Sequence, residues 1–183
     1  MGTAGIAKKN TRAILLASNA TLVGIASRRL ETAEKFRDEV APFYSSSKSD
    51  SSSIKLYGSY SEMLEDPSID AVYIPLPTAL HLEWAIKTAD AGKSMLLEKP
   101  AALSCGDLAT ILEACRRNSV SFMDGVMFMH GMRLKTLRRT LQDPYFGSVE
   151  RVNSSFSFHG DKNFLDSDIR VSPRSENFSS TVV

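Results

Sequence analysis

Cysteine, net charge and long hydrophobic runs are all scarce in this chain of 183 residues. Its two cysteines, Cys105 and Cys115, lack the spacing of a metal site and form no disulfide framework, which favours a reducing compartment such as the cytoplasm. No apolar run approaches the roughly 20 residues that a membrane-spanning helix needs. The formal net charge of +1 gives no electrostatic case for a nucleic-acid partner. The sequence therefore predicts no metal, no membrane association and no nucleic acid.

The chain does contain enough apolar sequence for a packed core. Hydrophobic residues make up 43% of it and charged residues 23%, which is typical of a folded domain. Its length fits one domain, or one domain with part of another. The basic stretch "RLKTLRR" at 133–139 is the one feature that would indicate nucleic-acid binding, and we interpret it instead as the solvated face of a helix.

Apolar runs typical of strands alternate with amphipathic patterns typical of helices. Strands are predicted over 20–27, 54–59, 70–75, 94–100 and 120–128, and helices over 28–43, 60–69, 81–92, 104–118 and 131–143. Ser61 and Ser104 are predicted to open two of the helices, and Gly92 to close one. A last alternating stretch, 147–160, predicts the first strand of a second domain.

This alternation predicts an α/β fold in which right-handed crossovers build a parallel sheet. A doubly wound sheet of this kind binds its ligands at the carboxyl ends of its strands. The unusual residues of the sequence fall at those ends, in 2–7, 27–29, 75–78 and 98–100, and from Asp124 onward. We therefore expect them to gather around one site.

The first of these stretches is "GTAGIAKK", in which Gly2, Ala4 and Ala7 have the spacing of a dinucleotide-binding fingerprint. Small residues there let the backbone approach a pyrophosphate at a helix N-terminus. The candidate cofactor-binding residues are Gly2, Thr3, Ala4, Gly5, Ile6 and Ala7. A plain helix-opening turn is an equal interpretation. Because the fingerprint normally follows a strand, we expect the first strand of the sheet to be missing.

The second stretch is "ASRR", which closes the strand predicted at 20–27. An acidic residue at this point would bind the ribose hydroxyls of NAD, whereas Ser27, Arg28 and Arg29 suit the 2′-phosphate of NADP. The alternative is a pair of solvated arginines at the start of a helix. Cations are unfavourable at a helix N-terminus, so we favour NADP over NAD.

The third stretch, "IPLPTALH", places two prolines at the end of a strand. Prolines stiffen a loop and remove backbone donors, so the stretch is either an ordinary turn or one wall of a nicotinamide pocket. The pocket would be formed by Pro75, Leu76, Pro77 and Thr78, with His81 beside them. We do not predict catalysis by His81, because a lone histidine is more often structural.

The fourth stretch is "EKP", where an apolar run ends in Glu98, Lys99 and Pro100. A lysine at the carboxyl end of an inner strand points into the crevice, where its ammonium can donate to a substrate oxygen and stabilise developing negative charge. A surface turn is the other interpretation. Lys99 is the candidate catalytic residue, and all three residues are candidates for cofactor contact.

Together these stretches resemble the glucose–fructose oxidoreductase/inositol dehydrogenase/rhizopine-catabolism (Gfo/Idh/MocA) family. The matching sequences are "GTAGIA", "GIASR", the long stretch 57–100 and "SFMDGVMFMH", the last looking most like plant members and the dihydrodiol and xylose dehydrogenase branch. The resemblance implies an NAD(P)-dependent oxidoreductase acting on a sugar, polyol or related hydroxyl compound. It also implies a Rossmann-type domain at 1–125 and the start of a second, α+β domain at 126–183.

Roles for individual residues also follow from the resemblance. The loop at 2–7 would hold the pyrophosphate, and Ser27 with Arg28 would suit NADP. The loop at 75–78, together with His81, would flank the nicotinamide. Lys99 would be catalytic and would also contact the cofactor.

The family pattern further includes a strand before the fingerprint and an aspartate–histidine pair in the second domain. His159 and Asp161 do not match that pair, so we expect a chain truncated at both ends. The alternative function is then a non-catalytic fragment that binds a nucleotide or a partner. The second domain carries the family's oligomer interface, so a homo-oligomer is expected where that domain is intact.

Overall fold

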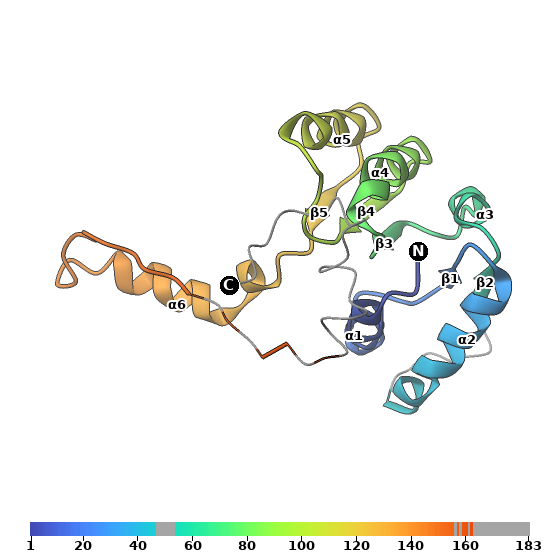
Figure 1. Cartoon of the computed structure of the whole chain (residues 1–183), viewed down its shortest axis with the longest axis horizontal. Helices are drawn as coiled ribbons and strands as arrows, with labels where there is room; N and C mark the ends of the chain where they lie inside the picture. Colours follow the sequence, from blue (N-terminus) through green and yellow to red (C-terminus); the bar gives the residue numbers. More distant parts are fainter. Residues whose placement is uncertain (47–53, 156, 158, 161, 163–183) are drawn as a thin grey trace. The chain divides into compact units, whose positions relative to one another are not determined.

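The computed structural model describes residues 1–46, 54–155, 157, 159, 160 and 162. The chain divides into two compact units, Met1–Gly125 and Val126–Val183. All strands of the described residues belong to the first unit (Figure 1). None of the described helices combines the length and the hydrophobicity needed to cross a lipid bilayer.

The first unit alternates helices and strands along the sequence, as predicted. Its helices are α1 (Gly5–Leu16), α2 (Leu30–Val40), α3 (Tyr60–Glu65), α4 (His81–Asp90) and α5 (Cys105–Arg117), with 3-10 turns η1 (Ala41–Ser46) and η3 (Thr78–Leu80). Its strands are β1 (Gly24–Ala26), β2 (Lys55–Tyr57), β3 (Ala71–Ile74), β4 (Ser94–Leu97) and β5 (Phe122–Asp124). The second unit contributes η4 (Met127–His130) and α6 (Met132–Leu141).

The strands pair in parallel, which confirms the predicted α/β class, but they form two sheets. β1 pairs with β2, and β4 pairs with both β3 and β5. A doubly wound sheet has a strand between the two halves that these sheets represent. Among the described residues, Met1 and Gly2 bond to the two facing edges: the Gly2 N–H donates to the Ala26 carbonyl at 2.8 Å, and the Met1 amine donates to the Tyr73 carbonyl at 3.0 Å.

Two apolar clusters form the core of the first unit. The larger one joins the sheet of β3, β4 and β5 to α3, α4 and α5, and includes Val72, Ile74, Ala85, Leu97 and Ile111. The smaller one joins β1 to α1 and α2, and includes Ala7, Leu15, Ile25, Phe36 and Val40. Burying a large aliphatic side chain of this kind stabilises the fold by about 1.5–3 kcal/mol.

Two of the three predicted helix ends are confirmed. The Ser104 hydroxyl accepts from the Asp107 N–H at 3.1 Å at the start of α5. Gly92 follows α4 with a φ of +70°, the left-handed conformation in which glycine is favoured. The prediction for Ser61 is wrong, because Ser59 caps α3 by accepting from the Glu62 N–H at 3.1 Å.

Most predicted elements extend beyond the observed ones, and one predicted strand is wrong. The helix predicted at 28–43 is α2 followed by the 3-10 turn η1, in which Pro42 cannot donate a helical hydrogen bond. The strand predicted at 120–128 ends at Asp124, ahead of η4. The strand predicted at 147–160 is wrong over its continuously described part, 147–155, where no neighbouring strand supplies the pairing that a strand needs.

The second unit, by itself, buries little. No residue of α6 is buried, and several of its apolar side chains, Met132, Leu137 and Leu141, are exposed. The basic residues of 133–139 are exposed as well, as expected of a solvated helix face. His159 is exposed, and Asp161 lies outside the described residues.

Candidate active site

A cavity of about 500 Å³ lies at the carboxyl ends of β1 and β3, where a parallel sheet binds its ligands. Three loops line it: the one before α1, the one between β1 and α2, and the one after β3. The lining residues are Gly2, Thr3, Ala4, Ser27, Arg28, Arg29, Thr32, Tyr60, Pro75, Leu76 and Pro77. Nine of these eleven are sequence-predicted candidates. The structure therefore brings together residues 75 positions apart in the chain.

The loop before α1 approaches the β3 loop closely because residue 2 is glycine. Gly2 has a φ of +84°, and a Cβ on it would lie 2.8 Å from Cδ2 of Leu76. Downstream, α1 begins at Gly5 with Ala4 as its N-cap, no side-chain cap and no acidic residue in its first turn. Its free N–H groups and the positive end of its dipole suit an anion. Gly5, Ile6 and Ala7 belong to the helix and do not line the cavity.

The loop after β1 brings positive charge to the cavity. Ser27 is buried, and its N–H donates to the Tyr57 carbonyl at 3.2 Å, which extends the pairing of β1 with β2. Arg28 and Arg29 are exposed on the lining. Burial raises the pKa of the Tyr60 hydroxyl, and the positive charge of Arg28 partly opposes that rise.

His81 holds two loops together. Its Nε2 lies 2.8 Å from the Leu76 carbonyl, and its Nδ1 lies 3.0 Å from the Pro100 carbonyl and 3.3 Å from that of Ala101. The imidazole is almost fully buried, as is Thr78. Neither side chain lines the cavity, and the His81 ring connects the backbone that follows β3 with the backbone that follows β4. Its place beside a nicotinamide stays a prediction.

Glu98 and Lys99 follow β4 and differ in burial. Glu98 is buried, and its Oε1 accepts from the Tyr73 hydroxyl at 2.7 Å and from the Asn10 amide at 3.4 Å. Gly125 makes room for it, because a Cβ there would lie 3.1 Å from the Glu98 carboxyl carbon. Lys99 is exposed.

The Lys99 backbone contacts the Glu98 carboxylate. Its N–H lies 3.3 Å from Oε2 of Glu98, and the Lys99–Pro100 peptide bond is cis. Glu98, Lys99 and Pro100 lie outside the lining of the cavity. The arrangement leaves the lysine amine free to meet a ligand while its backbone is anchored by a buried carboxylate.

No group of three or more metal-ligating side chains gathers anywhere in the described part of the chain. The cavity itself presents the N-terminus of α1 and the guanidinium groups of Arg28 and Arg29. These are the groups that bind phosphates.

Comparison with known proteins matches residues 1–126 to the model of an oxidoreductase family with an NAD-binding Rossmann fold. The chain belongs to the Gfo/Idh/MocA oxidoreductase family. The predicted family and fold class are thus confirmed, while the likeness to plant members stays a prediction.

Relatives within the Gfo/Idh/MocA family include sugar enzymes. The chain is 34% identical over 160 residues to D-xylose 1-dehydrogenase (NADP(+)) 2 of Haloferax volcanii, covering 86% of the chain and 45% of that protein. It is 35% identical over 111 residues to a dTDP-3,4-didehydro-2,6-dideoxy-alpha-D-glucose 3-reductase of Saccharopolyspora spinosa, covering 61% and 32%.

A solved structure supports the same relationship. The 3-ketoreductase KijD10 of Actinomadura kijaniata, in complex with TDP-benzene and NADP, matches with a TM-score of 0.65 and 28% identity, covering 76% of this chain and 41% of that one. The chain spans less than half the length of all three relatives.

Sequence reasoning missed four residues of this Gfo/Idh/MocA site. Thr32 and Tyr60 line the cavity from the first turns of α2 and α3, and Asn10 and Tyr73 hold Glu98. Tyr60 comes three residues after the end of β2, so the strand-end rule could have predicted it as a lining residue. No sequence signal pointed to Asn10 or Tyr73, because their contacts with Glu98 depend on how distant elements pack.

Proposed function

We propose that this protein is an oxidoreductase that binds NADP(H) in the cavity at the ends of β1 and β3 and acts on a sugar. The main support for this proposal is that the Gly2 loop, the N-terminus of α1 and the pair Arg28 and Arg29 meet at one cavity. A xylose dehydrogenase and a sugar-nucleotide reductase among the relatives support a sugar or polyol substrate. NADP in the names of relatives supports NADP over NAD.

The described residues fit such a cofactor. The backbone of Gly2, Thr3 and Ala4 leads into the uncapped N-terminus of α1, which would hold the pyrophosphate. Ser27 and the guanidinium of Arg28 would hold the 2′-phosphate, since guanidinium binds phosphate in a bidentate manner. The prolines at 75 and 77 would border the nicotinamide. Bound NADP supplies a nicotinamide that accepts or donates hydride.

Lys99 would act on the substrate oxygen. In its charged form the amine donates a hydrogen bond to the hydroxyl or carbonyl oxygen at the reacting carbon and stabilises negative charge there. Glu98 is the positioning residue, because its buried carboxylate lies against the Lys99 backbone and is itself held by Tyr73. The proton partner, the remainder of the substrate pocket and any oligomer contact would come from the family's second domain, whose aspartate–histidine pair His159 and Asp161 do not match.

The test pairs binding with turnover. NADPH binding is measured by fluorescence, and turnover with D-xylose and a panel of other aldoses and polyols by nicotinamide absorbance. We expect Lys99→Ala to lower turnover by about 100-fold or more while NADPH affinity changes little. Lys135→Ala, at an exposed position of α6, is the matched control and should leave both unchanged.

Three outcomes are informative. Turnover that survives in Lys99→Ala contradicts the role of Lys99. NADPH binding without turnover on any substrate favours the alternative, a fragment that binds nucleotide without catalysis. A folded chain that binds no NADPH contradicts the proposal as a whole.

A further inference from the structure

His81 is the first residue of α4, and backbone carbonyl groups surround its ring. Only 1% of the residue is exposed. Nε2 lies 2.8 Å from the Leu76 carbonyl oxygen, and Nδ1 lies 3.0 Å and 3.3 Å from those of Pro100 and Ala101. Among the described residues, the ring is the one hydrogen-bond partner of each of these three carbonyls. Both ring nitrogens therefore face acceptors.

A neutral imidazole cannot bond to carbonyl oxygens on both of its sides. It has a single N–H group, and its other nitrogen presents a lone pair, whereas a carbonyl oxygen can only accept. A ring with a proton on each nitrogen donates in both directions. Histidine is also the side chain whose charge changes between about pH 5 and 8. The number of hydrogen bonds that the His81 ring makes therefore depends on the number of its protons.

The two sides of the ring differ in their access to water. The hydrogen bond to the Leu76 carbonyl is buried, whereas the bonds to Pro100 and Ala101 are partly buried. An acceptor that loses its donor is less unfavourable where water can replace the donor. When the ring has a single proton, we therefore expect that proton on Nε2, which leaves the carbonyls of Pro100 and Ala101 without their donor.

No charged side chain of the described residues bonds to the ring. The carboxylates of α4 are paired elsewhere, Glu83 with Lys87 and Asp90 with Arg117. The elements packed against α4 are η3, β3, β4 and α5. Their ionisable residues, with the two that follow β4, are Tyr73, Glu98, Lys99, Cys105, Asp107, Glu113, Cys115, Arg116 and Arg117. The three carbonyl dipoles favour a second proton on the ring, and the positive end of the α4 dipole opposes it.

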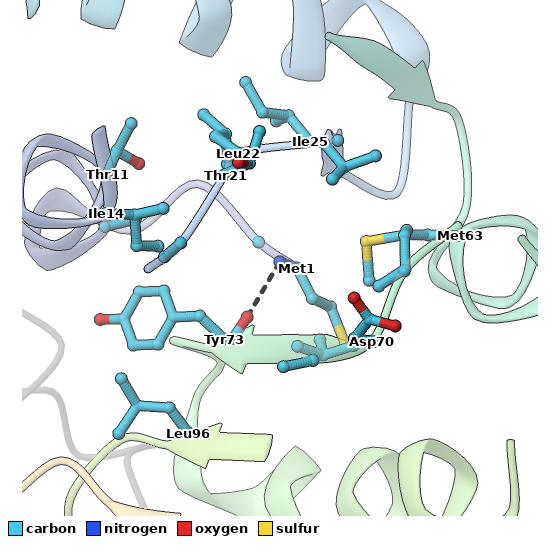
Figure 2. A pocket seen from close by; sticks show the side chains of 18 of the residues that line it. Met1, Thr11, Ile14, Thr21, Leu22, Ile25, Met63, Asp70, Tyr73 and Leu96 are labelled. Carbon is cyan, nitrogen blue, oxygen red and sulfur yellow. Dashed lines mark hydrogen bonds between the residues drawn. The ribbon is translucent and has the colours of Figure 1, made fainter. Parts of the chain in front are cut away.

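The backbone on either side of Lys99 is bonded to a different face of the larger sheet. On one face, Glu98 accepts from Tyr73 and contacts the Lys99 N–H. Figure 2 shows the Tyr73 side chain on this face, which is turned toward α1. On the other face lies α4, whose His81 bonds to the carbonyl of Pro100. The ring therefore acts on the Lys99 backbone independently of the Glu98 carboxylate.

We propose that His81 is a proton-dependent positioning residue. With a proton on both ring nitrogens, it ties the Leu76 turn, a wall of the cofactor cavity, to the Pro100 turn, which directly follows Lys99. Loss of the Nδ1 proton releases the Pro100 turn and leaves the contact with Glu98 in place. The consequence for catalysis by Lys99 rests on the proposed function. The tie itself can be tested without NADP, so the failure of one proposal is distinguishable from the failure of the other.

The first experiment follows ring protonation by nuclear magnetic resonance of the whole chain with isotope-labelled histidine, from about pH 5.5 to about pH 8.5. His130→Gln and His159→Gln identify the signals of the other two histidines, which are exposed. At the lower pH we expect protons on both nitrogens of His81, and at the higher pH on Nε2 only. The amide signals of Lys99 and Ala101 should shift with the same midpoint as the ring, because the peptide group between them loses its donor.

The variant His81→Gln provides a second arm. A glutamine amide can donate to the Leu76 carbonyl from the position of Nε2, but it cannot also donate to Pro100. At about pH 5.5 its unfolding equilibrium constant should exceed that of the wild-type chain by about tenfold, and at about pH 8.5 the two should agree within about threefold. His130→Gln is the matched control, and it should leave the unfolding constant unchanged at both pH values.

Four results would overturn the proposal. The first is a His81 ring with a single proton at both ends of the pH range, and the second is a ring that keeps both protons throughout. The third is a ring that titrates while the amides of Lys99 and Ala101 do not follow it. The fourth is an equal loss of stability in His81→Gln at both pH values, which would indicate a packing role without the proton. If His81→Gln does not fold, the resonance measurement on the unmodified chain decides.

Discussion

The Tyr73 hydroxyl donates to the Glu98 carboxylate at 2.7 Å and so joins β3 to the end of β4, the residue before Lys99. Burial raises the pKa of Tyr73, and its bond to Glu98 raises it further, so the hydroxyl stays a donor. The carboxylate in turn lies against the Lys99 N–H. The hydrogen bond between Tyr73 and Glu98 therefore helps to fix the backbone that carries the Lys99 side chain.

Tyr73→Phe should loosen this arrangement without opening a cavity. The change removes one hydrogen bond to a buried charged group, and we expect the free energy of unfolding to fall by about 1.5–3 kcal/mol in urea denaturation. Tyr145→Phe is the control, because Tyr145 is fully exposed and its loss should cost almost nothing. Equal stability of the two variants would mean that the Tyr73–Glu98 bond does not contribute.

Arg28→Ala should weaken NADPH binding by about tenfold or more, because a charge-assisted bond to the 2′-phosphate is lost. NADH lacks that phosphate, so its affinity should stay within about twofold. Arg12→Ala is the matched control, since Arg12 is exposed on α1 and does not line the cofactor cavity. An equal loss for both nucleotides would indicate general disruption of the cavity.

Gly2→Ala should damage both stability and cofactor binding. The left-handed φ of +84° costs a residue with a Cβ about 1–2 kcal/mol, and the added methyl would lie 2.8 Å from Cδ2 of Leu76, which must shift. Gly5→Ala is the control, because a Cβ there meets nothing within 4 Å at the first position of α1. Urea denaturation and NADPH titration of the two variants separate them. If both behave alike, the approach of Gly2 to Leu76 is not important.

The buried amine of Met1 should make stability depend on pH. Its pKa falls from 8.0 to about 5 on folding, so between these values the unfolded chain binds a proton that the folded chain does not. The free energy of unfolding therefore rises with pH across this window, by up to about 1.4 kcal/mol per unit. Acetylating the amine should remove this part of the slope. Identical pH profiles for acetylated and free chains would contradict the burial of the amine.

Most of the cofactor cavity could be predicted from the sequence. Its residues lie where strands end, and a parallel sheet brings the ends of its strands to one edge. This rule placed Gly2, Ser27 and Pro75 together although no local pattern connects them. Lys99 and Glu98 show its limit, because both lie at a strand end but only their packing decides which one turns inward.

The remaining features depend on three-dimensional contacts. Ser59 and Ser61 are both serines ahead of an apolar pattern, and only the backbone shows which hydroxyl faces the free N–H of Glu62. The strand predicted at 147–160 has a suitable alternation, yet a strand needs a partner edge as well as a pattern. The bonds of Met1 to Tyr73 and of Gly2 to Ala26 could not be expected either, because they depend on packing.

The most direct test of the central claim is a fluorescence titration of the purified chain with NADPH and, in parallel, NADH. The account predicts saturable binding of NADPH that is at least about tenfold tighter than that of NADH, because Ser27 and Arg28 meet the 2′-phosphate. Equal affinities for the two nucleotides, or no binding of either to a folded sample, would contradict it.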